Sequence, residues 1–62
     1  MKNQFHILYP DNRYVNAATI LSWFADAVAN AEIDGVENAA GYDAEAAAEL
    51  LDNAGHITLA VR

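Results

Sequence analysis

Residues 16–31 read NAATILSWFADAVANA, and this stretch decides the fold. Its apolar side chains recur at helical spacing on one side; they are Ile20, Leu21, Phe24, Ala27, Val28 and Ala31. Polar side chains form the opposite stripe, made of Thr19, Ser22, Asp26 and Asn30. Asn16 stands just before the pattern and is a good N-cap residue. The spacing predicts an amphipathic helix of about four turns that ends near residues 31–33.

Strand patterns lie at both ends of the chain. In residues 4–9, Phe5, Ile7 and Tyr9 alternate with other side chains, and this period of two is typical of a half-buried strand. Residues 56–61 alternate in the same way, with Ile57, Leu59 and Val61 on one side. Residues 10–12, Pro-Asp-Asn, favour a turn, after which residues 13–15 can return as a short strand.

A second, shorter helix is predicted near the C-terminal end. Asp34 and Gly35 break the first helix, and residues 36–41 form either a loop or a single helical turn. Asp43 then caps a helix that begins at Ala44, and Gly55 ends it. Its apolar face consists of Ala47, Leu50, Leu51 and Ala54.

These elements predict an α+β fold in a single domain covering residues 1–62. Because a lone strand leaves its backbone groups unsatisfied, the terminal strands should pair with each other. We expect a small, mainly antiparallel sheet of two or three strands that includes both terminal strands, with two helices packed on one face. The chain contains no cysteine, so its stability must come from this core or from a partner subunit.

Charge is distributed unevenly along the sequence. Nine acidic residues and three basic residues give a formal net charge of -6. The basic residues Lys2, Arg13 and Arg62 flank the segment 14–61, which contains carboxylates but no lysine or arginine. Phosphate binding requires basic side chains that displace counterions, so we expect no direct contact with nucleic acid. A basic protein surface is the better candidate partner.

The predicted second helix carries the strongest candidate site. Glu45, Glu49 and Asp52 share one face, and Glu37 and Asp43 come just before them. Like charges four residues apart weaken a helix slightly, and no basic residue is interleaved to relieve the repulsion. This stripe is either a recognition surface for a basic groove or a solvated face that keeps the protein soluble.

Three aromatic side chains are candidate binding anchors. Trp23 falls at the border between the apolar and polar sides of the first helix, and Tyr14 and Tyr42 fall in connecting segments. Tryptophan and tyrosine are enriched at binding hot spots. The alternative for Trp23 is a boundary residue that covers the rim of the core.

Catalytic and metal-binding motifs are lacking in the sequence. His6 and His56 could meet near Asp11, but their spacing matches no metal site, and two surface histidines are the simpler interpretation. Ser22, the single serine, has no evident base beside it. We expect no enzymatic activity, no metal and no cofactor. With no signal-peptide core or membrane-spanning stretch in the sequence, a cytoplasmic protein is expected.

Two functions fit these observations. In size, charge and lack of catalytic motifs the chain resembles small inhibitors encoded by phages and mobile elements, including anti-CRISPR and anti-restriction proteins. That resemblance rests on overall character and assigns no residue. It implies a protein-binding inhibitor that mimics nucleic acid and occludes a basic nucleic-acid-binding surface of its partner. The alternative is a structural module that acts as a homodimer or as a small subunit of a larger complex, paired through a sheet edge.

Overall fold

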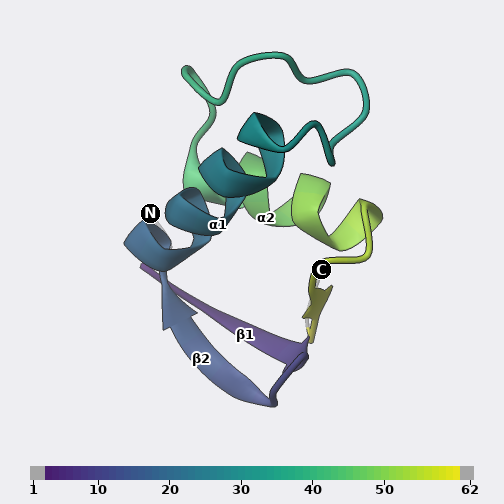
Figure 1. The fold of residues 1–62 in the computed structure, drawn as a ribbon. Coiled ribbons are helices and arrows are strands. Elements are labelled where there is room, and N and C mark those ends of the chain that lie inside the picture. The colour runs from purple at the N-terminus through teal and green to yellow at the C-terminus, as the bar shows by residue number, and fades with distance from the viewer. Residues whose placement is uncertain (1–2, 61–62) are drawn as a thin grey trace.

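A computed structural model describes residues 3–60 of the chain (Figure 1). It contains three strands and two helices, which confirms the predicted α+β fold. In chain order these elements are β1 (Gln4–Tyr9), β2 (Arg13–Asn16), α1 (Ala17–Ala29), α2 (Ala44–Asn53) and β3 (Thr58–Leu59). In Figure 1 both helices lie above the sheet, and the loop that joins them lies on the side farthest from the sheet.

The sheet has the order β2-β1-β3, and both pairings are antiparallel. Phe5 of β1 pairs with Val15 of β2, so the predicted hairpin is confirmed. Ile7 of β1 pairs with Leu59 of β3, so the two terminal strands lie side by side. The central strand is therefore the first one in the sequence, held on one side by a local turn and on the other by the far end of the chain.

The third strand begins later than predicted. Within residues 3–60 it covers Thr58 and Leu59, whereas the sequence predicted residues 56–61. The register shifts between Ile7 and Tyr9, and the backbone N–H of Leu59 donates to the side chain of Asp52. The Ala60 N–H donates to His6 O across the β1–β3 pair, so the Leu59 N–H faces the outer edge of β3, where the Asp52 carboxylate satisfies it. Val61, also predicted to belong to this strand, lies outside the described residues.

One apolar core joins the sheet to both helices. It consists of Phe5, Ile7, Val15, Ile20, Phe24, Ala27, Ile33, Ala47, Ala48, Leu51 and Ile57. Most of the predicted core residues are buried or pack at its edge. Tyr9 is an error of the prediction, since its side chain is 56% exposed beyond the register shift in β1. Leu21 is a second error, 37% exposed on the outer side of α1.

Both helices begin at the predicted caps. The side chain of Asn16 accepts a hydrogen bond from Thr19 N at 2.8 Å, and the side chain of Asp43 accepts one from Ala46 N at 2.8 Å. Each cap satisfies one of the backbone N–H groups that a helix leaves free at its start. The local sequence therefore determines where each helix starts.

The two helices also end with the same motif. At the end of α2, Gly55 has φ 86°, Gly55 N donates to Asp52 O at 3.0 Å, and His56 N donates to Leu51 O at 2.9 Å. At the end of α1, Ala31 N donates to Val28 O at 3.0 Å and Glu32 N donates to Ala27 O at 2.8 Å. These bond pairs define the Schellman motif.

The residue at the turn differs between the two motifs. In α1 the left-handed position is held by Ala31, with φ 60°, where α2 has glycine. This turn ends α1 at Ala29, earlier than the predicted end at residues 31–33. This early end of α1 is hard to predict from the sequence, because alanine favours helix continuation and is sterically disfavoured in the left-handed region.

We expect glycine at position 31 to stabilise the protein. Ala31→Gly should raise the free energy of unfolding by about 0.5 kcal/mol, because the left-handed cost of roughly 1–2 kcal/mol exceeds the added chain entropy of about 0.4–1 kcal/mol. Gly55→Ala should lower the free energy of unfolding by about 1 kcal/mol through the left-handed backbone alone. An added Cβ meets no atom within 4 Å outside its chain neighbours. Urea denaturation followed by circular dichroism measures both changes.

The matched control is Ala25→Gly, an exposed position inside α1. That change should destabilise the protein by about 1 kcal/mol through helix propensity alone. If Ala31→Gly destabilises as much as Ala25→Gly, the left-handed turn at Ala31 is not the conformation in solution.

Candidate functional site

The acidic face of α2 is only partly as predicted. Glu45 and Glu49 are exposed, and within residues 3–60 neither side chain forms an ion pair. Glu37 is exposed in the loop before the helix, and Asp43 is exposed while its side chain caps α2. The open part of the face is therefore the pair Glu45 and Glu49, one turn apart near the start of the helix.

Asp52 plays a different part from the one predicted. The sequence placed it in solvent beside Glu45 and Glu49, but its side chain is partly buried, and Oδ2 accepts a hydrogen bond from Leu59 N at 3.1 Å. The carboxylate thereby ties α2 to β3. Helical spacing assigns Asp52 to the polar face correctly, but which backbone group lies beyond that face depends on the tertiary fold.

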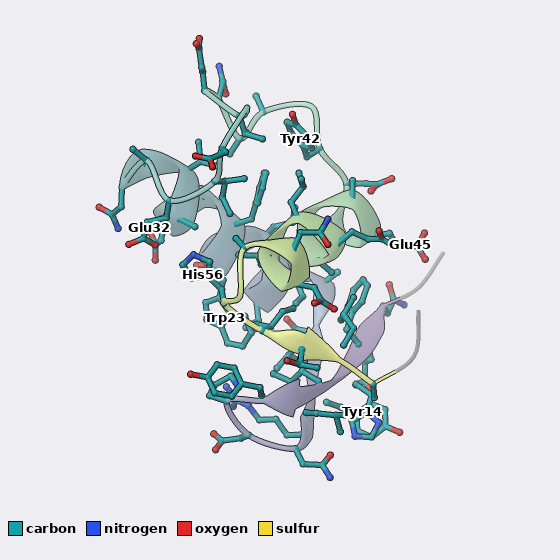
Figure 2. All side chains as sticks on the ribbon, turned by 90° about the vertical axis from the view of Figure 1, so that its right-hand side faces the viewer. Tyr14, Trp23, Glu32, Tyr42, Glu45 and His56 are labelled. Carbon is teal, nitrogen blue, oxygen red and sulfur yellow. The ribbon has the colours of Figure 1, made fainter. Side chains whose placement is uncertain are left out.

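The three predicted aromatic anchors lie in different places (Figure 2). Tyr42 is partly buried and packs its ring against Phe24, with ring centroids 5.1 Å apart. Trp23 is partly buried, and the guanidinium of Arg13 lies 5.6 Å from its ring centroid. Tyr14 is 65% exposed on β2. Tyr42 therefore belongs to the packing around the core, while Tyr14 and Trp23 reach the surface at separate sites.

Each histidine has its own partners. The ring of His6 stacks on Tyr14, with centroids 4.5 Å apart, and its Nε2–H donates a hydrogen bond to Asn12 Oδ1. His56 Nε2 lies 3.5 Å from Glu32 Oε1, an ion pair when the imidazole is protonated. Within residues 3–60 no group of three or more His, Asp or Glu side chains is arranged to hold a metal ion.

A groove brings some of the predicted residues together. It has a volume of about 810 Å³, is open to solvent, and is lined by residues of α2 and of all three strands. We call it the acidic groove, and its polar lining consists of Gln4, His6, Tyr14, Glu45, Glu49 and Asn53. Two predicted carboxylates and one predicted aromatic side chain therefore line a single concave surface.

A second hollow lies beside Trp23 and has a volume of about 330 Å³. We call it the Trp23 pocket; its polar lining includes Asp26, Asn30, Glu32 and His56. Figure 2 shows Trp23, Glu32 and His56 on one side of the molecule and Glu45 on the other. Sequence reasoning missed this pocket: it placed Trp23 beside Asp26 and Asn30 on α1, but had no signal that brings His56 to them.

Within the described residues no helix is long and apolar enough to span a bilayer. Comparison with protein-family models, with curated proteins and with solved structures finds no match to this chain. The geometry of the two concave surfaces is therefore the basis for a functional hypothesis.

Asp52 gives the first test of this description. Asp52→Ala should lower the free energy of unfolding by about 1–3 kcal/mol, because the Leu59 N–H loses a charged acceptor in a partly buried position. The Leu59 amide should also exchange its hydrogen faster. Urea denaturation and NMR-detected exchange measure the two effects.

Glu49→Ala is the matched control, because it removes a carboxylate from an exposed position on the same helix. It should change stability by less than about 0.5 kcal/mol, as surface substitutions usually do. Equal effects of the two substitutions would contradict the structural role given to Asp52.

Proposed function

We propose that this chain is a binding protein, not an enzyme, and that its acidic groove engages a basic surface of a partner protein. The observation that carries the proposal is the exposed pair Glu45 and Glu49, which has no cation partner within residues 3–60 and borders a concave surface. Unrelieved repulsion between two carboxylates one turn apart costs a helix a few tenths of a kcal/mol. A cationic partner relieves this repulsion and is attracted to both carboxylates.

The shape of the groove supports a protein surface as the partner. A groove of about 810 Å³ accepts several side chains, and Tyr14 adds an exposed ring of the kind common at binding hot spots. Asp43 and Glu37 extend the negative charge along the approach to α2. Such a surface attracts a basic partner from a distance and raises the rate of association.

The proposed action is inhibition. A basic protein surface that fits closely spaced carboxylates is also suited to phosphates, so occupation by this chain would exclude nucleic acid from the partner. This is the mode of action implied by the resemblance to anti-CRISPR and anti-restriction proteins. We propose that this action takes place in the cytoplasm, where a bacterial nucleic-acid-binding partner would meet its nucleic acid.

The test combines charge reversal with competition. The tagged chain captures proteins from a bacterial lysate, and mass spectrometry identifies them; the purified partner is then titrated against labelled DNA or RNA. The double variant Glu45→Lys, Glu49→Lys should weaken partner binding by more than about tenfold, since like charges placed opposite each other cost several kcal/mol. Wild-type binding should weaken as salt rises, and the wild-type chain should displace the nucleic acid.

The control variant is Asp11→Lys, Asp34→Lys, which makes the same change in net charge at two exposed positions that do not line the groove. It should retain most of the binding. If both double variants bind as the wild type does and the affinity is flat with salt, the carboxylates serve solubility alone and the proposal is wrong.

A second function is favoured by the outer face of the sheet. Leu8 is 47% exposed and Tyr14 is 65% exposed, and by strand alternation both fall on the side of the sheet opposite to the buried Phe5, Ile7 and Val15. Tyr14, which also lines the acidic groove, lies on β2, whose outer edge is unpaired among the described residues. Exposed apolar side chains next to an open strand edge are suited to pairing with a second copy.

Light scattering separates the two functions. An inhibitor that acts alone should have the monomer mass of 6.7 kDa, whereas a homodimer should have twice that mass without any added partner. In the second case Tyr14→Lys should return the protein to the monomer mass. A dimer that survives Tyr14→Lys would exclude the outer sheet face as its interface.

A further inference from the structure

The Trp23 pocket has features of a cation site. Its floor is apolar and includes Ala27, Leu51 and Ile57, all buried in the core. Its rim carries the carboxylates of Asp26 and Glu32. Among the described residues that line it there is no lysine or arginine. The pocket therefore combines an aromatic side chain, an apolar floor and two carboxylates.

The ends of the two helices add to this negative potential. Asn30 caps the C-terminus of α1, and Leu51 lies in the last turn of α2; both line the pocket. The C-terminal end of a helix carries partial negative charge, and cations near it are stabilised. Neither helix has a basic residue in its last turn. Glu32 and His56 are the last residues of the two Schellman motifs. At the rim of the pocket, Glu32 Oε1 lies 3.5 Å from His56 Nε2.

The chain itself shows that the Trp23 ring accepts a guanidinium. Arg13 lies over the indole at 5.6 Å from its centroid, a cation–π contact. Arg13 does not line the pocket, so it contacts the indole from outside it. A second planar cation inside the pocket would meet the remaining part of the indole and the carboxylate of Asp26, which no hydrogen bond or ion pair engages within the described residues.

We infer that the Trp23 pocket binds an arginine side chain of a partner protein. The planar guanidinium suits this site better than an ammonium, because it stacks on an aromatic ring and donates to carboxylates in its own plane. The carboxylates of Asp26 and Glu32 accept hydrogen bonds from the guanidinium N–H groups. The aliphatic part of the arginine side chain packs on the apolar floor. That the arginine belongs to the partner of the acidic groove rests on the proposed function; the binding of a guanidinium does not.

A small probe tests the pocket without any partner. N-acetyl-arginine amide is titrated into the protein and compared with N-acetyl-citrulline amide, which has nearly the same shape but no charge. Trp23 is the single tryptophan of the chain, so its fluorescence and its indole N–H signal in NMR report on this site. We expect a saturable change with the arginine probe at millimolar concentration, and a response to the citrulline probe that is at least about fivefold weaker.

Two double variants locate the binding. Asp26→Asn with Glu32→Gln should weaken the arginine probe about fivefold or more. Glu45→Gln with Glu49→Gln removes the same charge from the acidic groove and should leave the affinity unchanged. Circular dichroism melting curves confirm that both variants fold. An equal response to both probes, or an equal loss in both variants, would overturn the inference, and so would the absence of any saturable change. Failure here leaves the capture and competition results for the acidic groove unaffected.

Discussion

Burial of the apolar stripe of α1 is the interaction on which the rest of the structure depends. Ile20, Phe24 and Ala27 are almost fully buried between the sheet and α2. A chain of this size buries only about 60% of the surface that its unfolded form exposes, and this one has no disulfide to compensate. Phe24 is among the largest fully buried side chains, and it contacts the ring of Tyr42 from the loop as well. Sheet, helices and loop therefore share one small core.

Local chemistry predicted most of the fold. The caps Asn16 and Asp43, the turn at residues 10–12 and the stop at Gly55 each act through their own neighbours, so the sequence alone reveals them. Alternation predicted the terminal strands, and the need to satisfy backbone groups predicted that they pair. Each of these patterns can be recognised within a few neighbouring residues of the sequence.

The errors arise where distant segments meet. The Asp52 carboxylate accepts a hydrogen bond from the Leu59 N–H, and neither residue signals the other in the sequence. Ala31 takes a left-handed conformation against its own preference, two residues before the buried Ile33. The candidate sites divide in the same way. Glu45 and Glu49 follow from helical spacing alone, whereas the Trp23 pocket requires the ends of both helices and the segment before β3 to be in place.

The pairing of β1 with β3 has a consequence for folding order. The hairpin of β1 with β2 and the contact of α1 with α2 join segments that are close in sequence, but Ile7 and Leu59 come from opposite ends of the chain. Closing so long a loop costs entropy before the contact contributes any stabilisation, so β3 should join the sheet last. By the same reasoning it should detach first, and its departure would bare one edge of the central strand. For a short interval the molecule would then offer β1 as a template on which another chain could add a strand.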